Sequence, residues 1–186
     1  MAVVLASASP RRKELLGFIY DNFEICVSDV KEETSETLTP EETVKELARM
    51  KGAAVSENHS EDTVISADTV VVLDDMILGK PHSKDDAFNM LRSLSGRSHT
   101  VYTGVAVFDK ENAFTFADKT EVTFYPLSDE EINRYIDSGE PFDKAGGYGI
   151  QGKGSVMIQS IKGDYYNVMG LPVALLYRKL KEHSLL

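Results

Sequence analysis

The pattern of apolar and polar positions along this chain of 186 residues predicts strands and helices that alternate. Residues 63–73 form a nearly continuous run of β-branched and aliphatic side chains, which is typical of a strand buried on both faces. Residues 3–5 form a shorter run of the same kind, and residues 23–27 alternate between apolar and polar side chains. Further strands are expected at residues 76–78, 100–108, 113–125 and 155–161.

Capping residues predict where the helices begin. Serine and threonine side chains accept hydrogen bonds from the backbone N–H groups at a helix start, and a glutamate three residues later completes a capping box. Such a glutamate follows Thr39 and Ser128. Helices are expected to begin after Ser9, Thr39, Ser83 and Ser128, and a last helix is expected at residues 172–180.

The order of these elements predicts an α/β fold with a mixed sheet. Strands and helices interleave along most of the chain, which favours parallel strands, whereas residues 100–125 form a long hairpin, which adds antiparallel ones. We find no internal repeat, low-complexity segment or linker in the sequence. One domain over residues 1–186 is therefore predicted.

The composition excludes several classes of protein. Hydrophobic residues make up 42% of the chain and charged residues 27%, which excludes a disordered or collagen-like protein. A chain of this length buries roughly 70% of its unfolded surface and needs no disulfide to hold a core. Because its apolar runs are far shorter than the ~20 residues that span a bilayer, no membrane association is expected.

The net charge and the cysteine content indicate which binding partners and which cellular compartment to expect. The net charge of −10 repels nucleic acid, so no nucleic-acid partner is expected, although a local basic cluster or a metal can still attract a small anion. A single cysteine, Cys26, favours a reducing compartment. Residues 2–6 are too short for a signal peptide and are followed by basic residues, so the predicted location is the cytoplasm.

Residues 7–12, which join the first strand to the first helix, are a candidate anion site. Two hydroxyls, Ser7 and Ser9, lie beside two guanidiniums, Arg11 and Arg12. Backbone N–H groups at a helix start and arginine side chains both favour phosphate groups. The alternative is a solvated basic patch with a serine cap.

Asp68 is the best candidate for a catalytic group because it lies within an otherwise apolar strand. An isolated buried carboxylate is costly, so it needs a partner, a metal or a function. Asp68 can bind a divalent metal, act as a general base toward water, or do both. Glu32, in an acidic loop, is a candidate second metal ligand. The alternatives are a structural carboxylate paired with lysine at Asp68 and a solvated charge at Glu32.

Two lysines extend the candidate site. Lys51 follows Val44 by seven residues and therefore lies on the buried face of its helix. This placement predicts one of two arrangements. Either this face of the helix borders a bound anion, or the aliphatic part of the Lys51 side chain packs against the core while its ammonium group reaches water. Lys80 lies in a stiff turn between Gly79 and Pro81, where its ammonium is either aimed at a ligand or exposed.

Residues 143–154 form a glycine-dense loop. Residues 147–152 match the dinucleotide fingerprint and residues 147–153 match most of a P-loop, but a helix precedes and a strand follows, so both are rejected. Glycines still let the backbone approach a ligand closely, and Gln151 offers a donor and an acceptor to a base. The alternative is a tight turn.

Six segments, in order, resemble the motifs of the Maf family, long called septum-formation inhibitors. Residues 5–16 (LASASPRRKELL) resemble its opening motif, and residues 66–71 (SADTVV) its second motif. The other segments are residues 78–81 (LGKP), 94–99 (LSGRSH), 143–152 (DKAGGYGIQG) and 163–172 (GDYYNVMGLP). Because the six follow one another over nearly the whole chain, the resemblance is highly specific.

The resemblance implies a nucleoside triphosphate pyrophosphatase, which releases a monophosphate and pyrophosphate. It implies an elongated mixed sheet with flanking helices, in two lobes around a cleft, like the inosine triphosphate pyrophosphatases. It also implies a divalent cation, Mg²⁺ or Mn²⁺, and a homodimer. Arg11, Thr69 and Gln151 match the residues of the branch that acts on dTTP and UTP, rather than the branch that acts on 7-methyl-GTP.

Together, these observations lead to one hypothesis of mechanism. Residues 7–12 hold the triphosphate with Lys51 and Lys80, and Asp68 with Glu32 holds the metal. Asp68 also activates the water that attacks the α-phosphorus. Two other hypotheses stay open: a nucleotide-binding regulator of cell division that acts through a protein partner, and a pyrophosphatase for modified bases that cleans the nucleotide pool.

Overall fold

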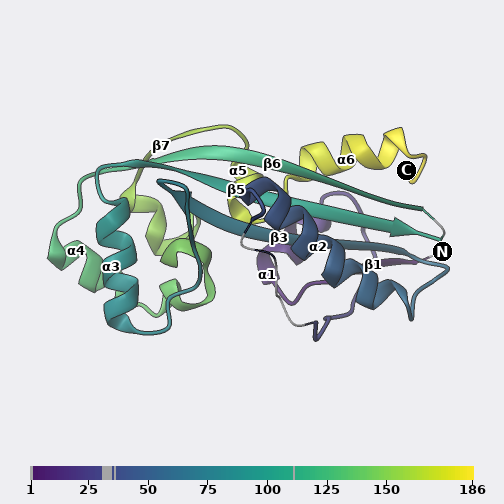
Figure 1. The fold of residues 1–186 in the computed structure, drawn as a ribbon, viewed down its shortest axis with the longest axis horizontal. Helices are drawn as coiled ribbons and strands as arrows, with labels where there is room; N and C mark the ends of the chain where they lie inside the picture. Colours follow the sequence, from purple (N-terminus) through teal and green to yellow (C-terminus); the bar gives the residue numbers. More distant parts are fainter. Residues whose placement is uncertain (1, 31–34, 36, 111) are drawn as a thin grey trace. The chain divides into compact units, whose positions relative to one another are not determined.

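The computed structural model describes residues 2–30, 35, 37–110 and 112–186, and its strands form one mixed sheet (Figure 1). The strands are β1 Val3–Leu5, β2 Glu24–Ile25, β3 Thr63–Leu73, β4 Met76–Leu78, β5 Ser98–Asp109, β6 Asn112–Phe124 and β7 Ile158–Lys162. Their order in the sheet is β2-β1-β3-β5-β6-β7, and β4 pairs with β3. The predicted class, α/β with a mixed sheet, is confirmed.

The helices begin where the capping residues predict. The helices are α1 Pro10–Leu16, α2 Pro40–Ser56, α3 Lys84–Leu94, α4 Asp129–Ile136, α5 Tyr165–Met169 and α6 Val173–Glu182, with 3₁₀ helices at Glu140–Asp143, Ala145–Gly147 and Gly152–Met157. Ser9, Thr39, Ser83 and Ser128 each accept a hydrogen bond from the backbone N–H three residues later. The capping boxes after Thr39 and Ser128 are complete.

The pairing of β3 with its neighbouring strands determines which residues lie beside each other in the sheet. β1 runs parallel to β2 and to β3, and its last residue, Leu5, pairs with Ile65. Three contacts join β3 to β5: Thr63 to Asp109, Ser66 to Ala106 and Thr69 to Thr103. Each step forward along β3 is matched by an equal step backward along β5, so this pair is antiparallel.

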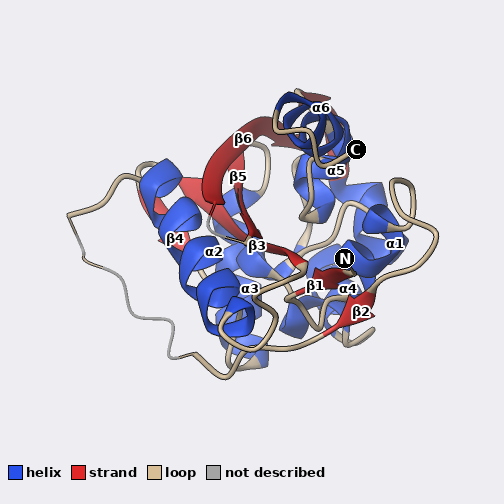
Figure 2. Ribbon diagram, turned by 90° about the vertical axis from the view of Figure 1, so that its right-hand side faces the viewer, coloured by secondary structure: helices blue, strands red, loops and turns tan. Residues whose placement is uncertain are grey.

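The chain divides into two compact units. The first holds residues 1–69, 103–118 and 170–186, and the second holds residues 70–102 and 119–169. In the first unit, α2 covers one face of the sheet, while α1 and α6 lie on the other (Figure 2). Beside α6, the imidazole of His183 stacks on the ring of Phe114, with centroids 3.8 Å apart.

The second unit has its own apolar core, in which α3 and α4 pack side by side (Figure 1). Leu91, Leu94 and Ile132 from these helices are fully buried, and so is Phe124 of β6. His99 lies in this core. Its ring meets Phe124 and Tyr148 edge to face, and its Nε2 is 2.6 Å from the Tyr148 hydroxyl.

Two predicted strands need correction, and one short helix was not predicted. The strand expected at residues 155–161 is Ile158–Lys162, because residues 152–157 form a 3₁₀ helix in which Gly154 packs against the backbone of Gly149. The strand expected at residues 23–27 is only two residues long, and its apolar side chains are exposed at the sheet edge. The short helix Tyr165–Met169 was not expected.

In the described part of the chain, no helix combines the length and apolar character needed to cross a membrane.

Candidate active site

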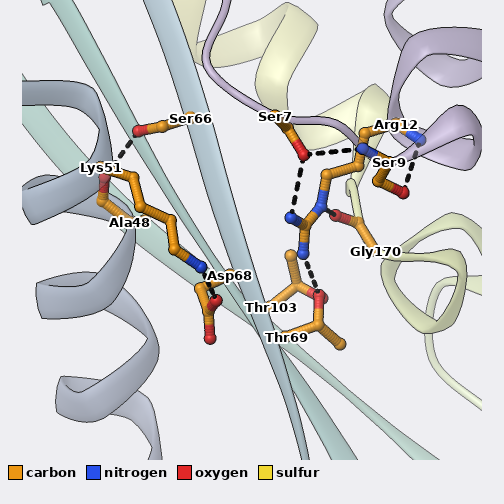
Figure 3. Close-up of polar contacts among 10 residues, drawn as sticks. All are labelled: Ser7, Ser9, Arg12, Ala48, Lys51, Ser66, Asp68, Thr69, Thr103 and Gly170. Atoms are coloured by element: carbon orange, nitrogen blue, oxygen red, sulfur yellow. Dashed lines mark hydrogen bonds and ion pairs between the residues drawn. The ribbon is translucent and has the colours of Figure 1, made fainter. Parts of the chain in front are cut away.

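Asp68 of β3 and Lys51 of α2 form an ion pair that is largely withdrawn from water. The Lys51 Nζ lies 2.6 Å from Asp68 Oδ1, and the two side chains are 15% and 12% exposed (Figure 3). The ammonium is therefore aimed at a carboxylate, not at bulk water. The predicted placement of Lys51 on the buried face of its helix is confirmed. The lysine partner foreseen for a structural Asp68 is also present, so geometry alone fits both readings of Asp68.

Close packing of α2 on the sheet brings this pair together. A Cβ added to Gly52 would lie 2.5 Å from the Phe108 ring, and one added to Gly104 would lie 2.3 Å from the Val44 carbonyl group. The helix and the sheet approach so closely at these two positions that only glycine, which has no Cβ atom, fits. The buried Ser66 hydroxyl donates a hydrogen bond of 2.6 Å to the Ala48 carbonyl, which fixes the helix against β3.

A second polar cluster surrounds Arg12 of α1. Its Nε donates to the Gly170 carbonyl at 2.8 Å, and its two terminal nitrogens donate to the hydroxyls of Ser7 at 3.3 Å and Thr69 at 3.0 Å (Figure 3). The Ser7 hydroxyl also accepts the backbone N–H of Ser9 at 3.3 Å. Thr69 is therefore brought to Ser7, Ser9 and Arg12 of the predicted anion site. Arg11 lies half-buried in the first turn of α1.

The two clusters lie on opposite faces of β3, because consecutive strand residues point to opposite sides. Asp68 faces α2 and Thr69 faces Arg12 (Figure 3). β1 pairs with β3 only as far as Ile65, so Asp68 and Thr69 both lie beyond the end of that pairing. The two clusters are therefore carried by adjacent residues of one strand.

Lys80 and Gln151 belong to the second unit. Lys80 is exposed in the turn after β4, and Gln151 is half-buried at the start of the 3₁₀ helix Gly152–Met157. The loop that carries Gln151 is held by the backbone N–H of Lys153, which donates to the Glu140 carboxylate at 3.0 Å. A shared site of Lys80 and Gln151 with Asp68 stays a prediction.

The predicted metal site consists of Asp68 and Glu32. Glu32, the predicted second ligand, lies outside the described residues. Among the residues that the structure describes, no three His, Cys, Asp or Glu side chains gather to hold a metal ion. The Asp68 carboxylate still fits the predicted cation, because Mg²⁺ is commonly held by one or two carboxylates, waters and the substrate's phosphates. The contact with Lys51 uses only part of its acceptor capacity.

Sequence reasoning missed the residues that support the site. Thr103 of β5 is fully buried, and its hydroxyl lies 2.9 Å from that of Thr69. Gly52, Gly104 and Ser66 set the approach of α2. The available signal was a small or hydroxyl-bearing residue inside an apolar strand or helix face. That signal shows where packing is close, but it does not show which element packs there.

The fold of the chain resembles that of two solved proteins. The chain is similar to a HAM1 protein from Coxiella burnetii, with a TM-score of 0.54 and 13% identity over 98% of this chain and 100% of that one. The Ham1 protein of Staphylococcus aureus matches 67% of this chain and 72% of its own, with a TM-score of 0.50 and 15% identity. At these identities the likeness shows the fold alone, a mixed α/β fold that this chain shares with the Ham1 proteins.

The chain belongs to the Maf family, as the motifs predicted. The family model described as Maf-like protein matches residues 2–183. A dTTP/UTP pyrophosphatase of Bacillus cereus is 53% identical over 98% of this chain and 96% of its own length. A dTTP/UTP pyrophosphatase of Bacillus mycoides is 54% identical over 97% of this chain and 94% of its own length.

Proposed function

We propose that this protein hydrolyses dTTP and UTP to the monophosphate and pyrophosphate. The observation that carries the proposal is the placement of the Asp68 carboxylate and the Thr69 hydroxyl on consecutive residues of β3, beyond the end of its pairing with β1. Relatives more than half identical over nearly the whole chain are named dTTP/UTP pyrophosphatases, which supports the same substrates here.

Asp68 acts as the general base in this proposal. Its carboxylate accepts a proton from water, and the resulting hydroxide attacks the α-phosphorus. The bond between the α-phosphorus and the bridging oxygen breaks, and its electron pair leaves with pyrophosphate. The Lys51 ammonium, 2.6 Å from Asp68, holds the carboxylate in one orientation and adds positive charge beside the reacting phosphates.

A divalent cation, Mg²⁺ or Mn²⁺, is part of the proposal. Asp68 would hold it together with Glu32 and the phosphates of the substrate. When bound, such an ion neutralises charge on the phosphate oxygens. Lys80 is proposed to contact the leaving pyrophosphate.

Recognition of the base is assigned to Arg11, Thr69 and Gln151, as the family resemblance implies. Arg12 donates hydrogen bonds to the hydroxyls of Thr69 and Ser7, which supports a role for Arg12 in orienting these groups toward the nucleotide. Activity on modified pyrimidine nucleotides, a homodimer and a cytoplasmic location stay predictions.

The test is pyrophosphate release from dTTP, UTP, CTP, ITP and 7-methyl-GTP, with Mg²⁺ or Mn²⁺ and with EDTA. The proposal expects release from dTTP and UTP that EDTA abolishes, and little release from ITP or 7-methyl-GTP. Nucleotide binding with no release under any condition would overturn the enzymatic proposal and favour the regulator of cell division. Release confined to ITP or 7-methyl-GTP would overturn the substrate assignment.

A further inference from the structure

Glu140 holds the loop that carries Gln151 on both flanks. Its carboxylate accepts the backbone N–H of Lys153, at 3.0 Å to Oε1 and 3.1 Å to Oε2. Its main-chain carbonyl accepts a hydrogen bond from the ammonium of Lys144 at 2.6 Å. We propose that Glu140 is a positioning residue that fixes the backbone beside Gln151 and leaves the Gln151 side chain available to the nucleotide. The inference rests on the proposed function, which assigns Gln151 to the base.

The 3₁₀ helix Gly152–Met157 begins directly after Gln151, which occupies the N-cap position with an extended backbone. A residue at this position commonly uses its side chain to accept one of the first N–H groups of the helix. Gln151 forms no such capping bond, and the Glu140 carboxylate accepts one of these N–H groups instead. Because Glu140 supplies the cap, the half-buried amide of Gln151 keeps its donor and its acceptor for a ligand.

Gly152 allows the carboxylate to come this close. A Cβ at Gly152 would lie 2.9 Å from Glu140 Oε1 and 3.0 Å from Oε2, and its φ of +71° favours glycine. The carboxylate therefore packs directly against the backbone of the residue that follows Gln151. Its negative charge repels a triphosphate, so Glu140 acts on the nucleotide through the loop and not by contact.

Two further side chains anchor the same loop. The Lys144 side chain is 13% exposed, and its aliphatic part packs on Gly149, where an added Cβ would lie 2.8 Å from the Lys144 Cε. The Gly149 N–H donates to the Tyr135 hydroxyl at 3.2 Å. Gln151 therefore lies between two anchored stretches of backbone, of which Glu140 holds the second. Removal of the Glu140 carboxylate releases the backbone on that side.

The test compares Glu140→Ala, which removes the carboxylate, with Glu140→Gln, whose amide oxygen can still accept the Lys153 N–H. The readout is kcat/KM for UTP and for dTTP in the full-length protein with Mg²⁺. Glu140→Ala is expected to lower both values about tenfold, the effect of one charge-assisted hydrogen bond, and Glu140→Gln is expected to recover most of this loss. Glu130→Ala is the matched control, because Glu130 is exposed in the first turn of α4, and it should retain the wild-type values.

A double variant separates positioning from a general loss of structure. Gln151→Ala alone must lower kcat/KM, and adding Glu140→Ala must then lower it no further, because the side chain that Glu140 positions is gone. A merely structural role gives the same further loss with and without Gln151, together with a lower Tm. Unchanged kcat/KM in Glu140→Ala, or an undiminished loss when it is added to Gln151→Ala, would overturn the inference.

Hydrogen exchange at the Lys153 amide, followed by NMR, measures the contact without any nucleotide. Exchange is expected to be faster in Glu140→Ala than in the wild type, and to return toward the wild-type rate in Glu140→Gln. Equal exchange in all three proteins would overturn the inference. A wild type inactive on dTTP and UTP would instead defeat the proposed function.

Gly152→Ala is the second variant, which serves if Glu140→Ala does not fold. Its methyl group would displace the Glu140 carboxylate while leaving that side chain in place. It must lower kcat/KM in the wild-type background and have no further effect when added to Gln151→Ala. An equal loss in both backgrounds would contradict the positioning role.

Discussion

The ammonium of Lys51 lies 2.6 Å from the carboxylate of Asp68, and both side chains are at least 85% buried. A pair of this kind gains little net stability from its own attraction, because both charges leave water. The loss of one partner, however, leaves the other charge buried and alone. The pair is therefore sensitive to single substitutions, in activity and in stability.

Lys51→Met tests the burial of this pair. The variant leaves Asp68 without its ammonium, so we expect the free energy of unfolding to fall by about 3 kcal/mol. Lys45→Met is the matched control on the same helix, because Lys45 pairs with Glu41 at 3.2 Å near the surface. Its expected change is below ~0.5 kcal/mol. Urea unfolding of both variants at pH 7 measures the difference, and equal losses would contradict a buried pair.

Arg12→Lys tests the cluster on the other face of β3. A lysine carries the charge but lacks the planar fork, so it cannot reach Ser7, Thr69 and Gly170 at once. We expect kcat/KM for dTTP to fall by about tenfold or more, since at least one charge-assisted hydrogen bond is lost. The control is Arg49→Lys, because Arg49 is half-exposed and pairs with Glu46 at 2.7 Å. Equal kcat/KM in the two variants would count against the cluster.

Gly52→Ala tests the close approach of α2 to the sheet. The new methyl group would lie 2.5 Å from the Phe108 ring and 2.6 Å from the Ser66 hydroxyl, so the helix must shift. We expect a loss of about 1–3 kcal/mol in the free energy of unfolding, together with lower kcat, because Lys51 moves with the helix. At Gly79 nothing lies within 4 Å of an added Cβ. A loss of stability in Gly79→Ala as large as that in Gly52→Ala would remove this explanation.

His99 predicts a dependence of stability on pH. Burial lowers the pKa of His99 from 6.5 to about 4. Between these values the unfolded chain binds a proton at this position and the folded chain does not, so stability falls as the pH is lowered from 6.5 toward 4. The loss amounts to roughly 3 kcal/mol, and above pH 6.5 the group contributes no pH dependence.

The variant His99→Gln tests whether His99 causes this pH dependence of stability, because glutamine does not titrate. Urea unfolding of wild type and variant at pH 7.5 and pH 4.5 separates His99 from the carboxylates, which titrate in both proteins. The difference in stability between the two proteins is expected to shrink at low pH. A difference that stays constant would show that His99 binds a proton as readily in the folded core as in the unfolded chain.

Local signals in the sequence predicted most of the elements. Ser9, Thr39, Ser83 and Ser128 mark helix starts because capping depends on residues within one turn. The strand at residues 63–73 was predicted with its full length, because burial on both faces leaves a continuous apolar run. Residues 155–157, predicted as the start of a strand, belong instead to a 3₁₀ helix whose conformation depends on the close contact of Gly154 with Gly149.

The site was predictable as a set of residues but not as an arrangement. Asp68 and Lys51 could each be singled out, because a charge on an apolar face is costly wherever it lies. Their pairing depends on Gly52 and Gly104, which act only when α2 meets the sheet. Thr103 could not be singled out, because a hydroxyl-bearing residue in a strand is ordinary until its neighbour across the sheet is known.

The most direct test of the central claim is pyrophosphate release from dTTP and UTP by the wild type and by Asp68→Asn. We expect metal-dependent release by the wild type and a fall in kcat of about 10²- to 10⁴-fold in the variant, as for the loss of a general base. The far-ultraviolet circular dichroism of Asp68→Asn should match the wild type, which shows that the fold is intact. A variant that releases pyrophosphate at the wild-type rate would remove Asp68 from the mechanism and contradict this account.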